Sequence, residues 1–309
     1  MTLDPQMQAI LDQMKAAGWK PTHMLSVAEA RRAFKGRVAE GAPVARTVDR
    51  TIPGYGGALP VRIHWPTGNG PFPALVFFHG GGWVLGDLDS HDVTCRSLTN
   101  QASCVTVSVD YRLAPEHKFP AAVEDAYVAT RWLADHAGDL GVDPARLAVG
   151  GASAGGNLAT VVSLMARERG GPSLVFQLLI YPVTDAALDT PSARTVTSDA
   201  YPLNRADMEW FWSHYLRDAA DRRDPRASPA LAPSLAGLPP ALVVTAEIDP
   251  LCDEGERYAE ALTRAGVATT HTRYDGVTHG FVGMEGALDK GRTAVAECAR
   301  ALRHAFGTS

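Results

Sequence analysis

The pentapeptide Gly151–Gly155, Gly-Ala-Ser-Ala-Gly, constrains the fold of this chain more than any other stretch. A short apolar run, Leu147–Val149, precedes it. The apolar residues that follow it recur at the spacing of one helix face: Leu158, Val161, Val162 and Met165. A Gly-x-Ser-x-Gly pattern between a strand and a helix is typical of a nucleophile elbow, a sharp turn that exposes a reactive serine. We therefore expect a strained backbone at Ser153, with its hydroxyl above a sheet at the positive end of a helix.

A less specific interpretation exists for the same five residues. The chain holds 29 glycines, and a glycine-rich turn between strand and helix can carry a serine that only caps the helix. The other parts of the sequence must decide between a capping and a catalytic serine.

Buried strands alternate with helices along most of the chain. Continuous apolar runs, which are typical of strands covered on both faces, lie at 74–78, 105–109, 146–150, 174–180 and 241–246. Helical patterns lie at 90–101, 121–137, 253–265 and 286–306, and a further strand is expected at 269–274. The segments 43–53 and 59–65 alternate apolar and polar residues, which favours antiparallel strands. The sequence thus predicts an α/β fold with a mostly parallel central sheet flanked by helices.

Two segments fall outside this alternation. Residues 1–40 are predicted to be helical, either as a plain N-terminal arm or as part of a lid. Residues 185–237 contain no buried strand and one strong amphipathic helix, whose apolar face holds Met208, Phe211, Trp212, Tyr215 and Leu216. Because residues 185–237 lie between two strands, we interpret them as an insertion within one domain that spans 1–309.

Composition narrows the function classes. The formal net charge is −5 and no long basic run occurs, so nucleic-acid binding has little electrostatic support. No run approaches the length of a membrane span, and the N-terminus lacks the pattern of a signal peptide, so a cytoplasmic location is expected. The four scattered cysteines are expected to be free thiols, not a zinc site. The adjacent His91 and Asp92 are interpreted as surface residues, not as a metal pair.

Three further features belong with Ser153. His79-Gly80-Gly81-Gly82-Trp83 follows the apolar run 74–78, and backbone N–H groups without a Cβ nearby suit the binding of an oxyanion. Asp249 follows the run 241–246, and His279 follows the run 269–274. Sites in open α/β sheets lie at the carboxyl ends of strands, and Ser, Asp and His occur in the chain order of a hydrolase triad. Asp253 is the nearest rival for Asp249.

These motifs together resemble those of the hormone-sensitive-lipase-like esterases of the α/β-hydrolase superfamily. The matching stretches are His79–Trp83, Asp110–Glu116, Gly151–Asn157, Asp249–Glu254 and His279–Phe281. One departure is Ala152, where the family commonly has Asp. The loss of that acidic side chain bears on the rigidity of the neighbouring loops, not on the triad. The segment Asp110–Glu116 is interpreted as structural.

The resemblance implies a serine carboxylesterase that needs no metal or organic cofactor. Ser153 would be the nucleophile, His279 the general base and Asp249 its partner, and the N–H groups of Gly81, Gly82 and Ala154 would hold the oxyanion. Residues 1–40 and 185–237 would form a helical cap. A homodimer is expected by resemblance only.

The substrate is expected to be a small-molecule ester with an acyl chain of about four to eight carbons, because bulky rings leave a short pocket. The residues predicted to contact it are Trp83, Met208, Phe211 and Trp212. An amidase or deacetylase with the same triad stays open. A non-catalytic receptor, like the plant gibberellin receptors that have lost the histidine, is disfavoured by His279.

Overall fold

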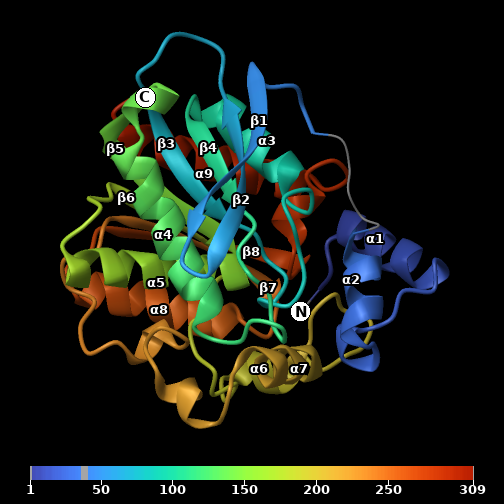
Figure 1. Ribbon diagram of the computed structural model, residues 1–309. Helices are drawn as coiled ribbons and strands as arrows, with labels where there is room; N and C mark the ends of the chain where they lie inside the picture. Colours follow the sequence, from blue (N-terminus) through green and yellow to red (C-terminus); the bar gives the residue numbers. More distant parts are fainter. Residues whose placement is uncertain (1, 36–40, 309) are drawn as a thin grey trace.

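A computed structural model describes residues 2–35 and 41–308 (Figure 1). In this part of the chain, eight strands form one sheet in the order β1-β2-β4-β3-β5-β6-β7-β8. The strands are β1 (Arg46–Gly54), β2 (Gly57–Trp65), β3 (Phe72–Phe78), β4 (Val105–Val109), β5 (Val142–Ala152), β6 (Phe176–Ile180), β7 (Ala241–Ile248) and β8 (Thr269–Thr278). β2 pairs antiparallel with both β1 and β4, and all other neighbours are parallel. The predicted mostly parallel sheet is confirmed.

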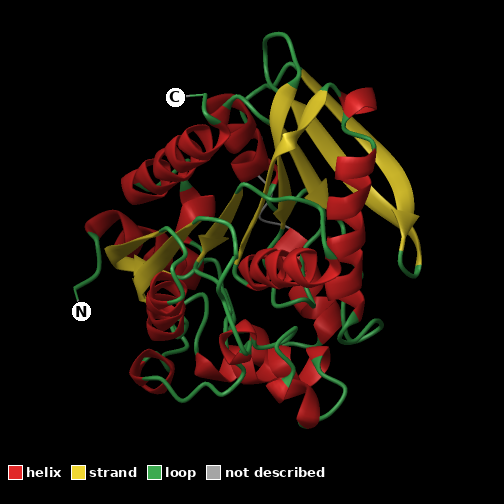
Figure 2. Ribbon diagram, turned by 90° about the vertical axis from the view of Figure 1, so that its left-hand side faces the viewer, coloured by secondary structure: helices red, strands yellow, loops and turns green. Residues whose placement is uncertain are grey.

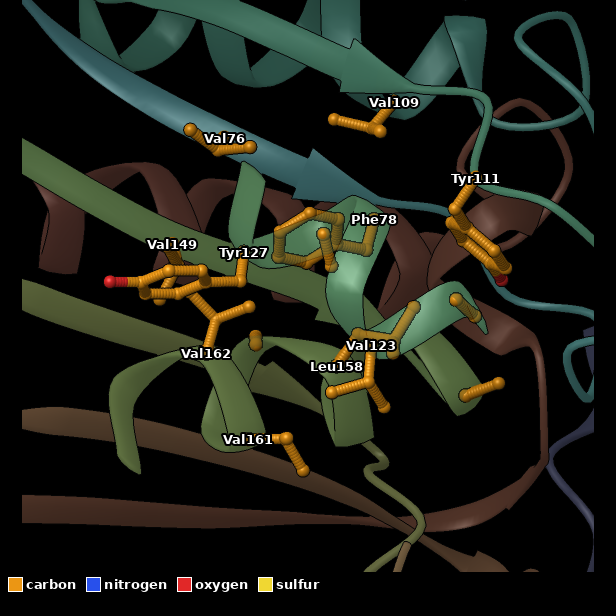
Figure 3. Close-up of a cluster of buried hydrophobic side chains, with 14 of the residues drawn as sticks. Val76, Phe78, Val109, Tyr111, Val123, Tyr127, Val149, Leu158, Val161 and Val162 are labelled. Carbon is orange, nitrogen blue, oxygen red and sulfur yellow. The ribbon is translucent and has the colours of Figure 1, made fainter. Parts of the chain in front are cut away.

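Helices cover both faces of the twisted sheet (Figure 2). On one face lie α4 (Ala121–Asp135), α5 (Ala154–Arg169) and α8 (Cys252–Arg264), and on the other lie α3 (Asp92–Ala102) and α9 (Asp289–Phe306). Since successive strand residues point to opposite faces, β3 contributes Val76 and Phe78 to one apolar cluster and Leu75 and Phe77 to the other. Figure 3 shows the first cluster, where Val123 and Tyr127 of α4 pack towards Val76 and Phe78.

The described part of the N-terminal segment is mostly helical, as predicted. It consists of α1 (Pro5–Ala16), a 3₁₀ turn at Thr22–Met24 and α2 (Val27–Lys35). Gly18 has a φ of +74°, a left-handed conformation that ends the first helical run. Ser26 and Glu29 form a capping box at the start of α2, with Ser26 N–H donating to Glu29 Oε2 at 2.9 Å. Residues 36–40, the end of the predicted N-terminal cap segment, lie outside the described residues.

The insertion between β6 and β7 contains α6 (Pro191–Thr195), α7 (Arg205–Tyr215) and two 3₁₀ turns. The amphipathic helix expected here is α7. It begins at a capping box in which Asn204 accepts from Asp207 N–H and Asp207 accepts from Asn204 N–H. α6 and α7 lie near α1 and α2 beyond the carboxyl ends of the strands (Figure 1). Both segments therefore stand next to the edge where a site is expected.

Other boundaries differ from the sequence-based expectations by a few residues. β5 begins at Val142 instead of 146, and β8 continues to Thr278 instead of ending at 274. His279 consequently follows its strand directly. The four cysteines are free and buried. Over residues 2–35 and 41–308, no helix is long and apolar enough to cross a membrane.

Candidate active site

The turn between β5 and α5 places Ser153 in a conformation with positive φ that residues with side chains rarely adopt, with φ +59° and ψ −119°. This strain, predicted from the pentapeptide, is confirmed. The flanking glycines are required by space, since a Cβ on Gly155 would lie 1.9 Å from the carbonyl oxygen of Phe78. A Cβ on Gly151 would lie 2.4 Å from Gly155. The strand and helix therefore meet closely only because both positions lack side chains.

Ser153, His279 and Asp249 form a continuous hydrogen-bonded chain. His279 Nδ1 lies 2.6 Å from Asp249 Oδ2, and His279 Nε2 lies 3.0 Å from Ser153 Oγ. Because the carboxylate accepts from Nδ1–H, Nε2 carries the lone pair that accepts from the serine hydroxyl. The structure brings together three residues that are separated by 96 and 30 positions in sequence, at the ends of β5, β7 and β8.

The Asp249 carboxylate is fully buried and partnered at both oxygens. Its Oδ1 accepts from Leu251 N–H at 2.9 Å, while Oδ2 accepts from His279. Its rival Asp253 instead accepts from Ser192 N–H at 2.8 Å and so links α8 to α6. The geometry therefore favours Asp249 over Asp253 as the partner of the imidazole.

Tyr181 supports the imidazole from one side and was not singled out from the sequence as a site residue. Its ring centroid lies 4.5 Å from that of His279, and the side chain is buried. Tyr181 follows β6 and has a φ of +36°, rare for a residue with a side chain. The sequence signal was its position at the carboxyl end of a buried strand, where Asp249 and His279 also lie.

The glycine loop after β3 adopts conformations that other residues rarely reach, with φ +111° at Gly81 and +58° at Gly82. A Cβ at Gly81 would lie 2.3 Å from Leu85 O, and one at Gly82 would lie 2.1 Å from the Phe211 ring. Across the described residues, the N–H groups of Gly81 and Gly82 donate to no backbone acceptor. Ala154 is the first residue of α5, where an N–H has no acceptor within its helix. Three donors thus remain available beside Ser153.

Two histidines hold this loop, the buried His79 and the partly buried His91. His79 Nδ1 donates to Gly80 O at 2.8 Å, and His91 Nε2 accepts from Gly80 N–H at 3.3 Å. Tyr111 stacks on His79 at 4.2 Å and donates to His79 O. Burial lowers the pKa of His79 to about 4 and that of His91 to about 3, so both rings are neutral near pH 7. Only the neutral form of His91 can accept from Gly80.

The interpretation of His91 and Asp92 as surface residues is wrong. His91 lines the cavity above Ser153, and Asp92 is buried beneath it. Asp92 binds Arg96 Nε at 2.5 Å and Arg62 at 3.1 Å. Sequence reasoning missed this, because one partner, Arg62, comes from β2, although the spacing of Asp92 and Arg96 on one helix was a visible signal.

A cavity of about 130 Å³ lies above Ser153. Its floor includes the glycine loop, Ala152, Ser153, His279 and Tyr181. Its walls come from both segments predicted to form the cap. The N-terminal segment contributes Trp19, Lys20, Thr22, Leu25, Ala30, Ala33 and Phe34, and the insertion contributes Pro202, Leu203, Met208 and Phe211. None of these N-terminal residues was singled out from the sequence, because an amphipathic pattern does not say what its apolar face covers.

Of the four predicted contact residues, Met208 and Phe211 line this cavity, but Trp83 and Trp212 do not. Trp83 stacks on Tyr215 at 4.2 Å and tilts against Trp212 at 4.7 Å, and both indoles are fully buried. Their assignment to the pocket wall is therefore corrected. The physical reason is that these rings pack against one another in an aromatic cluster behind the wall.

Comparison with known proteins places these features in context. Residues 75–283 match the sequence profile of a family described by its alpha/beta hydrolase fold. The carboxylic ester hydrolase LipN of Mycobacterium tuberculosis is 46% identical over 293 residues, which are 92% of this chain and 78% of that protein. An ethyl acetate hydrolase of Pseudomonas putida is 40% identical, covering 98% of this chain and 99% of that protein. The solved structure of a hyperthermophilic esterase from the archaeon Pyrobaculum calidifontis is 44% identical, with a TM-score of 0.93 and complete coverage of both chains.

Proposed function

Because the chain belongs to the hormone-sensitive-lipase-like carboxylesterases of the α/β-hydrolase superfamily, we propose that Ser153, His279 and Asp249 are its catalytic residues. The protein is a serine carboxylesterase that acts on small-molecule esters. The observation that carries the assignment is the hydrogen-bonded chain from Asp249 through His279 to Ser153 Oγ.

Acylation begins when Ser153 Oγ attacks the ester carbonyl carbon. The serine proton moves to His279 Nε2, and the buried Asp249 carboxylate stabilises the imidazolium that forms. The carbonyl oxygen becomes an oxyanion, which the N–H groups of Gly81, Gly82 and Ala154 receive. When the tetrahedral intermediate collapses, the ester C–O bond breaks and the alcohol leaves with the proton from His279.

Deacylation repeats these steps with water. His279 takes a proton from a water molecule, whose oxygen attacks the acyl carbon of the acyl-enzyme. Collapse of the second intermediate returns the proton to Ser153 Oγ and releases the carboxylic acid. Since His279 must be unprotonated to accept in both half-reactions, activity rises with pH through a single group.

The segments 1–40 and 185–237 form the cap in this proposal, and their apolar walls select the substrate. The cavity of about 130 Å³ is small, which supports acyl chains of about four to eight carbons and poor turnover of long-chain triglycerides. The homodimer and the cytoplasmic location stay predictions.

A panel of p-nitrophenyl esters beside the matching p-nitroanilides tests the reaction type. Hydrolysis of the esters with little turnover of the anilides supports the carboxylesterase. Preferred turnover of the anilides would assign an amidase with the same triad. Binding of esters without turnover would indicate a receptor, an outcome that the hydrogen bond between His279 and Ser153 disfavours.

A further inference from the structure

A second cavity shares one lining residue, Trp19, with the catalytic cavity. This second cavity has a volume of about 430 Å³ and lies between the N-terminal segment and residues 199–201 of the insertion. Trp19 lines both cavities. The insertion also passes from one to the other, since Asp199–Tyr201 line the second cavity and the next two residues line the catalytic one.

The backbone that carries Trp19 is fixed at both ends. Trp19 N–H donates to Met14 O at 3.0 Å and so ties the residue to the end of α1. Four residues later, His23 donates from its N–H at 2.8 Å and from Nδ1 at 2.9 Å to Asp207 Oδ1. Asp207 is fully buried at the first turn of α7 and also accepts from Asn204 N–H. The backbone around Trp19 is therefore anchored to two elements, α1 and α7.

The second cavity has walls that suit an alkyl chain with a solvated end. Leu3 and Leu11 provide apolar surface next to Trp19, and Asp12 and Lys15 lie on the same cavity. Apolar surface stabilises each added methylene of a bound chain, whereas charged side chains require water or a polar chain end beside them. Nothing in this composition favours a metal ion or a nucleotide phosphate.

We propose that Trp19 is a partition that sets the upper length of the ester's alkyl chain, and that the second cavity is the extension which the partition closes off. This inference rests on the proposed esterase function and names the residue that limits its substrates. Trp19 acts by filling space, so a smaller side chain joins the two cavities without touching Ser153, His279 or the glycine loop.

The test compares the wild type with Trp19→Ala on two ester series. The first varies the acyl chain from acetate to dodecanoate on p-nitrophenol, and the second varies the alcohol chain on acetate. We expect kcat/KM for decanoate or dodecanoate, or for the corresponding alcohols, to rise at least about tenfold, because each further buried methylene contributes about fourfold. The readout is the ratio of kcat/KM for the long ester to kcat/KM for p-nitrophenyl acetate, because Trp19 also lines the catalytic cavity and a change common to all chain lengths cancels in this ratio. The series that responds identifies whether the acyl or the alcohol chain enters.

A matched variant closes the extension from its far side. Ala200 is exposed and lines the second cavity but not the catalytic one. Ala200→Trp in the Trp19→Ala background should restore the short-chain preference, and Ala200→Trp alone should change nothing. In a Phe211→Ala background, Ala200→Trp should also have no effect, because Phe211 lines only the catalytic cavity.

The outcomes are distinct. Three results would each refute the proposal that Trp19 limits the chain length. They are an unchanged chain-length profile in folded Trp19→Ala, an equal gain for all chain lengths, and a failure of Ala200→Trp to reverse the gain. Trp19→Leu, which keeps apolar bulk, is measured in parallel and should give a smaller shift in the same direction if Trp19→Ala does not fold. A wild type that hydrolyses no ester at all would refute the proposed function instead, whatever the variants do.

Discussion

At the scale of single residues, the triad assignment rests on which groups share hydrogen bonds. Ser153→Ala should lower kcat/KM for p-nitrophenyl butyrate by ~10³-fold or more with no change in the circular dichroism spectrum. Asp249→Asn should be far more damaging than Asp253→Asn, since only Asp249 contacts His279, while Asp253 accepts from Ser192 N–H. Steady-state kinetics of the three purified variants check this. If Asp253→Asn were the more harmful change, the carboxylate would have to be reassigned.

The neutral histidines under the glycine loop predict a pH dependence of folding. The pKa of His79 is lowered by burial to about 4 in the folded protein, against about 6.5 in the unfolded chain. The unfolded state therefore binds the proton first, and the free energy of unfolding falls as pH drops from about 6.5 towards 4. Denaturant unfolding of the wild type and His79→Asn, measured at several pH values, should show a flatter acid limb for the variant. Equal slopes would mean that His79 is not held neutral by the fold.

At the scale of elements, the glycine loop and α7 are in direct contact, which makes a double substitution informative. Gly82→Ala should lower kcat by about 10²-fold, because its Cβ would overlap the Phe211 ring and displace a donor worth roughly 3 kcal/mol. Removing the ring in Gly82→Ala/Phe211→Ala should recover part of the loss. Gly81→Ala should not be rescued this way, since its Cβ would meet the backbone at Leu85. If both single variants kept the full kcat, the glycine loop would not be part of the oxyanion hole.

At the scale of the whole molecule, the apolar face of α7 contributes residues to two different environments, the catalytic cavity and the aromatic cluster around Trp83. Phe211 lines the catalytic cavity, whereas Trp212 is buried against Trp83. Phe211→Ala should therefore move the acyl-chain optimum towards longer chains. Trp212→Ala should leave the optimum in place and destabilise the fold by about 3–5 kcal/mol, the usual cost of emptying a large aromatic site. Acyl-chain profiles and denaturant unfolding of both variants test this, and a shifted optimum in Trp212→Ala would contradict it.

Short-range patterns in the sequence determined the sheet, the elbow and the order of the reactive groups. Continuous apolar runs mark strands buried on both faces, and parallel strands bring their carboxyl ends to one edge. Ser153 and Asp249 each follow such a run, and His279 follows a further predicted strand, so their convergence could be expected without coordinates. The strained turn at Ser153 followed from the glycines on either side, because close packing there leaves no room for a Cβ.

Only the tertiary structure decided what each apolar face covers. Helical periodicity shows which residues share a face but not which part of the protein that face contacts. Phe211 and Trp212 were therefore equivalent in the sequence, whereas in the structure Phe211 lines the cavity and Trp212 packs against Trp83. The same holds for His91, whose role depends on Gly80 eleven positions earlier. It holds also for Trp19, which lines two cavities, and for the nearby contact between His23 and Asp207 at a sequence separation of 184 residues. Contacts over such distances depend on how complete elements pack, and no local pattern encodes them.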